Sequence, residues 1–193
     1  MSRSTIEGKK IMRLSGARQA IHDATAIHLL QRDGLDPTRY GCRISTSSMG
    51  SANSLILDAM EAGRILACID KQRAHVRDWL LYAYGAEASF SRLSYLRSYL
   101  FDRLFSTESR NERRRAKIAK LCALAVDDLK QRYNNGRSTP QAFFCSEIEI
   151  SEPNWRRDGY DKIVGGCHAE LQAMDRIGLY AVSDVIRRLR GMI

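Results

Sequence analysis

The sequence predicts an all-α fold of six or seven helices. Apolar residues recur at three- and four-residue spacing along most of the chain, which is the spacing of one helix face. No segment alternates apolar and polar residues for long enough to require a β-strand. The chain has 3 prolines and 13 glycines among 193 residues, which leaves room for long helices.

The N-terminal region, residues 1–50, is predicted to hold a basic arm, one helix and a linker. The helix is expected over residues 16–33, with Ser15 as its N-cap and Gly34 at its end. Residues 36–54 lose the helical spacing and are rich in Ser, Gly and Thr, which is typical of a linker. The basic residues of the arm are Arg3, Lys9, Lys10 and Arg13.

Residues 51–135 are predicted to form a helical body. In its third helix the leucines and aromatic residues are expected to point inward and the arginines outward, so no cofactor is assigned to that stripe. Asn134-Asn135-Gly136 ends the body with turn-forming residues. The expected helices are residues 55–69, 71–84 with Gly85 after it, 90–105 and 108–133.

The C-terminal region, residues 136–193, predicts a helix-turn-helix. Ser138 or Thr139 can cap a first helix that has Pro140 in its opening turn. Ser151 can cap a second helix, expected from about residue 152 to about residue 174. A last helix is expected over residues 177–190, after an interruption at Gly178.

The second helix of this pair is the candidate DNA reader. Asn154, Arg156 and Arg157 lie at its exposed N-terminal end, where a recognition helix presents side chains to base edges and phosphates. Arg137 and Lys162 complete the predicted DNA-binding set in this region. Two buried helices that meet at a tight corner of an ordinary helical bundle would give a similar pattern.

The charge distribution favours the DNA-binding interpretation. A net charge of +9 and a pI near 9.6 favour contact with nucleic acid or another polyanion. Residues 106–120 hold six basic and two acidic side chains, and Arg113, Arg114 and Arg115 are predicted phosphate contacts. The alternative is that this run is a solvated helix face. A further basic cluster, Arg187, Arg188 and Arg190, lies near the C-terminus.

No motif of the sequence predicts catalysis or a metal site. Glycine-rich phosphate loops, nucleophile elbows and paired-carboxylate motifs are missing, and the 4 histidines are scattered singly, so we do not expect an enzyme. The 5 cysteines contain no C-x-x-C pair, and Cys167-His168 suits a buried thiol beside a surface imidazole better than a zinc site. No metal or cofactor is therefore expected.

The chain also lacks the sequence features of a membrane or exported protein. No stretch approaches the roughly 20 apolar residues of a membrane span. The first ten residues, MSRSTIEGKK, have no apolar signal-peptide core. We expect a soluble protein of a reducing compartment.

The C-terminal region resembles the late-gene antitermination protein Q of lambdoid phages. The resemblance rests on ISEPNWRRDGYDKIVGGCHAE, with support from RSTPQAFFCSEIEI and from LLYAYGAEAS at residues 80–89. It implies a factor of the host bacterial cytoplasm that binds a promoter-proximal DNA element through Asn154, Arg156 and Arg157. It further implies loading onto paused RNA polymerase through the primary sigma factor and the mouth of the RNA exit channel, followed by read-through of terminators.

The resemblance is incomplete, and a second binding function competes with it. Members of the lambda type carry a cysteine-rich zinc-binding insert before the helix-turn-helix, where this chain has helix and basic charge instead. The rival is another phage DNA-binding protein, a repressor-like regulator or a small terminase subunit, in which the same helices bind DNA and the remainder oligomerises.

Overall fold

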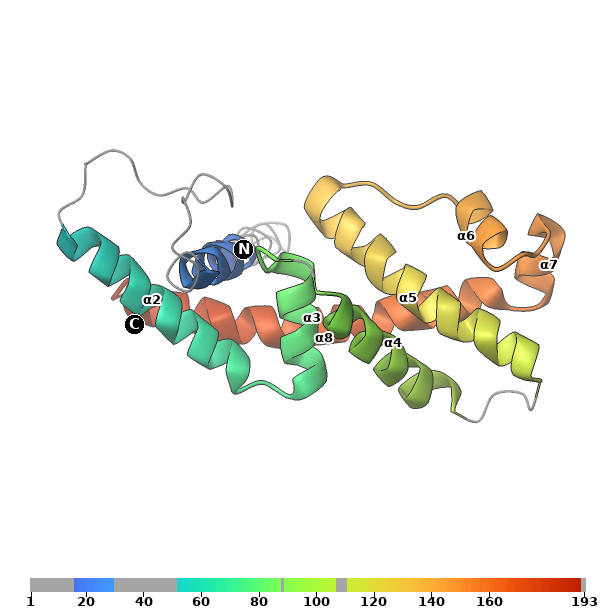
Figure 1. Ribbon diagram of the computed structural model, residues 1–193, viewed down its shortest axis with the longest axis horizontal. Helices are drawn as coiled ribbons and strands as arrows, with labels where there is room; N and C mark the ends of the chain where they lie inside the picture. The colour runs from blue at the N-terminus through green and yellow to red at the C-terminus, as the bar shows by residue number, and fades with distance from the viewer. Residues whose placement is uncertain (1–15, 30–51, 88, 107–110, 192–193) are drawn as a thin grey trace, which may run out of the picture. The chain divides into compact units, whose positions relative to one another are not determined.

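Figure 1 shows a computed structural model of the chain, which describes residues 16–29, 52–87, 89–106 and 111–191. The regular structure of these residues is entirely helical, which confirms the predicted all-α class. The predicted basic arm, the Ser15 cap, Gly34 and residues 36–51 of the predicted linker lie outside the described residues. After the helix of residues 16–29, the elements are α2 (Ala52–Asp70), α3 (Ala74–Tyr84), α4 (Phe90–Phe105), α5 (Glu112–Asn135), α6 (Gln141–Glu147), α7 (Glu152–Arg157) and α8 (Tyr160–Leu189).

The chain divides into two compact units. Unit 1 comprises Met1–Ala88 together with Asp175–Ile193, and unit 2 comprises Ser89–Met174. Helix α8 contributes to both, because the boundary falls between Met174 and Asp175. No helix in the described part of the chain combines the length and the apolar character that a membrane span requires.

Unit 1 is organised around the buried carboxylate of Asp175 on α8. Its side chain accepts hydrogen bonds from Trp79 Nε1 at 3.1 Å and Tyr84 Oη at 2.6 Å, both on α3. Arg18, on the helix of residues 16–29, donates from Nη2 at 3.2 Å. A buried carboxylate is stable only when such donors replace its water. These bonds therefore fix three helices of unit 1 around one side chain.

Gly178 does not interrupt the last helix, contrary to the sequence prediction, since α8 is continuous from Tyr160 to Leu189. A Cβ atom at this position would lie 2.5 Å from Leu80 Cδ1, a distance that real contacts do not reach. Glycine in a helix interior costs roughly 1 kcal/mol relative to alanine. Glycine at position 178 is therefore explained by the close packing of α8 on α3, which leaves no room for a Cβ atom.

The core of unit 2 forms between α4, α5 and the first part of α8. Leu96 and Leu100 of α4 are fully buried, but Phe90 is 83% exposed and Tyr95 is 39% exposed, so the prediction that all aromatics of this helix point inward is wrong. Asn111 caps α5, its side chain accepting from the Arg114 N–H at 3.3 Å. As predicted, α5 ends at Asn134-Asn135-Gly136, where Gly136 has φ of 65°.

Candidate nucleic-acid interface

Where the helix-turn-helix is predicted, the chain forms a corner made of two short helices, α6 and α7, and the residues between them. Helix α6 begins at Gln141, and neither Ser138 nor Thr139 caps it, because Pro140 occupies the cap position. The Thr139 N–H instead donates to Asp128 Oδ1 at 2.6 Å. Ser151 occupies the N-cap position of α7 as predicted, although its hydroxyl forms no capping bond.

The turn between α6 and α7 contains a strained residue that the sequence did not reveal. Glu149 has φ of 53°, the left-handed conformation that residues with a Cβ atom adopt at a cost of roughly 1–2 kcal/mol. The Ile150 N–H donates to the Cys145 carbonyl at 3.0 Å, and Lys117 Nζ donates to the Glu149 carbonyl at 3.1 Å. These two bonds hold the turn in its tight form.

The predicted second helix is broken, because α7 ends at Arg157 and α8 begins at Tyr160. Gly159 takes φ of 75° between them, a conformation that glycine adopts without strain. The apolar spacing seen in the sequence belongs to α8, where it buries Tyr160, Ile163, Val164, Cys167, Leu171 and Met174. Asn154, Arg156 and Arg157 therefore lie on a helix of only 6 residues.

Three aromatic rings fill the inside of the corner. The ring of Phe144 on α6 lies 5.8 Å from that of Trp155 on α7, and Trp155 lies 6.1 Å from Tyr160 at the start of α8. All three side chains are buried. Aromatic pairs of this geometry contribute roughly 0.5–1.5 kcal/mol beyond their buried area. This row links all three helices, so the short α7 is held by its neighbours.

The basic first half of α5 packs along this corner. Arg114 Nη2 donates to the Asp158 carbonyl at 3.2 Å, and its guanidinium lies 5.5 Å from the centre of the Tyr160 ring. Lys120 Nζ forms an ion pair with Glu147 Oε2 at 3.0 Å. Together with Lys117, these residues are spaced three apart and share one face of α5. The three-residue spacing of these cations is the sequence signal from which this contact could have been predicted.

The packing brings one predicted DNA-binding residue, Arg114, against the segment that follows α7. Arg113 is exposed next to Arg114, and Arg156 is exposed next to the Arg157–Asp158 segment that Arg114 contacts. Arg157 is exposed and pairs with Asp158 at 2.9 Å, and that hydrogen bond raises the pKa of the guanidinium. Asn154 is partly exposed, and Lys162 is exposed in the first turn of α8.

Two predicted residues lie apart from this group. The Arg115 guanidinium sits 5.3 Å from the centre of the Phe101 ring on α4. Arg137 is exposed beyond the C-terminal end of α5, from which the chain returns to α6 (Figure 1). At roughly 1.5 Å per residue, about 22 Å of helix separates Lys120 from Asn135, next to Arg137.

The charge of the corner depends on α5. Between residues 147 and 162 the sequence holds five acidic side chains and three basic ones, so the corner alone is not positive. Residues 112–120 of α5 supply Arg113, Arg114, Arg115, Lys117 and Lys120 against Glu112. The two segments in contact therefore hold eight basic and six acidic side chains, and α5 supplies the excess of positive charge.

A buried polar cluster surrounds Asp128 of α5, a residue that is only 1% exposed. Besides the bond from the Thr139 N–H to Oδ1, its Oδ2 atom lies 2.8 Å from Arg132 Nε and 3.2 Å from His168 Nε2. Burial lowers the pKa of His168, an effect that the nearby Asp128 opposes and Arg132 reinforces. The cluster ties the segment before α6 to α5 and α8.

Cys167 and His168 have separate roles, and His168 is buried, not at the surface as predicted. Cys167 Sγ lies 3.8 Å from Cys122 Sγ, and both side chains are fully buried. The hydrogen bond with the Cys122 thiol, together with burial, raises the pKa of Cys167, which keeps it protonated. The described residues contain no group of three or more His, Cys, Asp or Glu side chains arranged to hold a metal ion.

Comparison with known proteins gives one family. The model of the family described as Phage antitermination protein Q matches residues 46–190, which is more than half of the chain. No curated protein and no solved structure matches significantly. The matched range includes all the described helices except that of residues 16–29.

Proposed function

Because the chain belongs to the phage antitermination protein Q family, we propose that it binds a promoter-proximal DNA element through unit 2. In this proposal it then loads onto paused bacterial RNA polymerase that retains the primary sigma factor, and it lets the polymerase read through terminators. It acts in the cytoplasm of the host bacterium, and it is not an enzyme.

The observation that carries the DNA-binding proposal is the packing of α5 on the α6–α7 corner. Arg114 donates to the Asp158 carbonyl, and Arg113 and Arg156 are both exposed within two residues of this contact, which supports the proposal that they belong to one surface. A positive surface formed by two helices suits a phosphate backbone, since each neutralised phosphate releases counterions.

The residues have different proposed tasks at this surface. Arg156 and Asn154 are proposed to contact base edges, because α7 projects them from the corner and their side chains suit bidentate hydrogen bonds to guanine and adenine. Arg113, Arg157 and Lys162 are proposed to contact phosphates, which fixes the position of the duplex without reading it.

The more distant cations are proposed to contact the same duplex further along. Double-stranded DNA advances about 3.4 Å per base pair, so the roughly 22 Å length of helix between Lys120 and Asn135 corresponds to only about six or seven base pairs. A site of about 20 base pairs can therefore reach both the corner and Arg137. Arg115 stays a predicted phosphate contact on the α4 side of α5.

A repressor-like regulator or a small terminase subunit would also bind DNA. The family match favours antitermination over both, and an antitermination factor must contact protein as well as DNA. Unit 1 offers a separate folded surface that DNA binding by unit 2 does not require.

The first test is whether the corner selects DNA. Repeated selection of the full chain on a library of random duplexes of about 20 base pairs should enrich one sequence. Arg113→Gln with Arg156→Gln should abolish that enrichment, whereas Arg92→Gln with Arg97→Gln, an equal loss of charge on α4, should leave it in place. Enrichment that survives the first pair of substitutions contradicts the proposed surface.

A further inference from the structure

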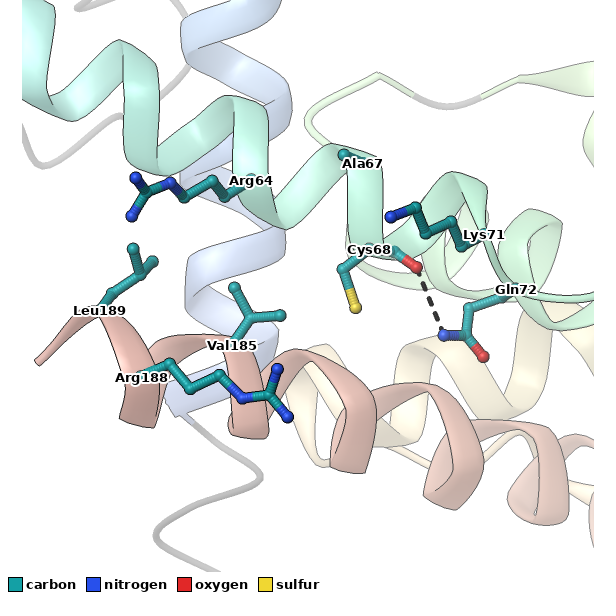
Figure 2. Close-up of a pocket in the computed structure, with 8 residues that line it drawn as sticks. All are labelled: Arg64, Ala67, Cys68, Lys71, Gln72, Val185, Arg188 and Leu189. Atoms are coloured by element: carbon teal, nitrogen blue, oxygen red, sulfur yellow. Dashed lines mark hydrogen bonds between the residues drawn. The ribbon is translucent and has the colours of Figure 1, made fainter. Parts of the chain in front are cut away.

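A groove lies between α2 and the C-terminal part of α8, within unit 1 (Figure 2). Its volume is about 480 Å³, in the range of sites that bind peptides and small molecules. It is lined by residues of the C-terminal half of α2, by Lys71 and Gln72 just after that helix, and by one turn of α8, and it shares no residue with the candidate DNA surface of unit 2.

Three cations surround this groove. Arg64 and Lys71 come from α2 and its C-terminal end, and Arg188 comes from α8. Within the described part of the chain, the side chains of these three residues form no ion pair with a carboxylate. The nearest acidic side chain on α8, Asp184, already pairs with Arg187. The groove therefore presents positive charge that forms no ion pair among the described residues of unit 1.

The groove is apolar between the cations. Ala67 of α2 and Val185 and Leu189 of α8 contribute aliphatic surface, and Figure 2 shows the Arg64 and Leu189 side chains at one end. At the other end the Gln72 amide donates to the Cys68 carbonyl at 3.3 Å. An apolar strip with charges along its sides is suited to a ligand that is itself amphipathic.

The spacing of the cations selects among anionic ligands. Arg64 and Lys71 are seven residues apart, which places them about 10 Å apart along the helix axis. A single phosphate is too small to bridge that distance. Carboxylates two turns apart on a helix have the same spacing, while apolar side chains on the next face would meet Val185 and Leu189. No aromatic residue lines the groove to stack a nucleotide base.

We propose that this groove binds an acidic amphipathic helix of a partner protein. The apolar face of that helix packs on Val185, Leu189 and Ala67, and its carboxylates pair with Arg64, Lys71 and Arg188. The inference rests on the proposed function, because it supplies the protein-binding surface that loading onto a polymerase complex requires. It adds the chemistry and the location of that contact.

Charge reversal tests the proposal. The probe is a fluorescent peptide of about 14 residues with leucines on one face and glutamates two turns apart beside them, measured by anisotropy with the full chain. Arg64→Glu with Arg188→Glu should weaken binding at least about tenfold, because like charges then face each other. A peptide with lysines in place of the glutamates should bind that variant and not the native chain. Arg92→Glu with Arg97→Glu is the matched control and should change neither affinity.

Cys68 reports on occupancy inside the groove. In a Cys42→Ser background, Cys68 is the thiol open to alkylation among the described cysteines, because Cys122, Cys145 and Cys167 are buried. The acidic peptide at ten times its Kd should slow Cys68 alkylation about tenfold, in proportion to the free fraction. A peptide of the same composition without an apolar face should give no protection.

Each other result overturns the proposal. Failure of the acidic peptide to bind, or equal binding by the Arg64→Glu, Arg188→Glu variant, shows that the groove is not such a site. Protection of Cys68 by a short single-stranded RNA in place of the peptide shows that the groove takes nucleic acid. The Arg64→Glu, Arg188→Glu variant should bind the selected duplex with the same affinity as the Arg92→Glu, Arg97→Glu control. A loss of peptide binding can therefore be told apart from a loss of DNA binding by unit 2.

Discussion

Salt dependence gives a direct measure of how many phosphates the unit 2 surface neutralises. Arg113 lies in the first turn of α5 and Lys162 in the first turn of α8, and both are exposed. Each cation that contacts a phosphate contributes about 0.9 to the slope of log K against log salt. The Arg113→Gln, Lys162→Gln variant should therefore lose about 1.8 from the magnitude of that slope.

The slope converts into a difference in affinity that is easy to measure. Between about 50 mM and about 200 mM salt, a slope change of 1.8 alters the ratio of native to variant affinity about twelvefold. The assay is fluorescence anisotropy on the selected duplex over a salt series, repeated on a duplex of unrelated sequence. Both duplexes should show the same loss, because phosphate contacts carry no sequence information.

Two results would refute this reasoning. An unchanged slope would mean that these cations face solvent or protein, and the corner would not be the DNA surface. A loss confined to the selected duplex would mean that they read bases. Arg92→Gln with Arg97→Gln serves as the control, since it removes the same charge from α4 and should leave the slope within error.

Three further predictions concern specificity and the buried carboxylates. Arg156→Ala should lower discrimination between the selected and unrelated duplexes by about 1–3 kcal/mol, and equal discrimination in a competition titration would exclude it as a reader. Because burial lowers the pKa of His168, the unfolded state binds its proton more readily. Thermal unfolding should therefore show stability lost as pH falls below about 6.5, with a smaller loss in His168→Asn. Asp175→Ala removes the buried acceptor of the Trp79 and Tyr84 hydrogen bonds and should cost about 2–5 kcal/mol in urea unfolding, against under about 1 kcal/mol for the ion-pair control Asp184→Ala. Equal costs would contradict the structural role of Asp175.

Local signals predicted much of the fold. The boundaries of α4 follow from its apolar spacing, and the end of α5 follows from Asn134-Asn135-Gly136, because each depends on neighbours along the chain. The break at Gly159 was missed, since the apolar spacing of α8 continues without a visible gap from Trp155. Gly178 was misread as an interruption because its cause, the Leu80 side chain, is 98 residues away.

The candidate site depended more on distant contacts. The sequence predicted the basic run of residues 106–120 and the candidate reader Asn154, Arg156 and Arg157, but the packing of these two segments rests on bonds such as Arg114 to Asp158, which are 44 residues apart. The buried roles of Asp128 and Asp175 have the same origin, since the main donors to Asp175 lie 91 and 96 residues away. From the sequence alone, a charged residue in a helix is predicted to be exposed, because its buried partners are not known. For this reason burial of polar groups was the least predictable property.

Transcription itself tests the central claim. The measurement is the fraction of transcripts that pass a terminator on a template carrying a promoter, the selected DNA site, a pause and the terminator, with bacterial RNA polymerase and its primary sigma factor. The native chain should raise that fraction, and Arg113→Gln with Arg156→Gln should not. If the native chain occupies its site on this template and read-through stays at the level without protein, the antitermination account is contradicted, and a repressor or packaging role takes its place.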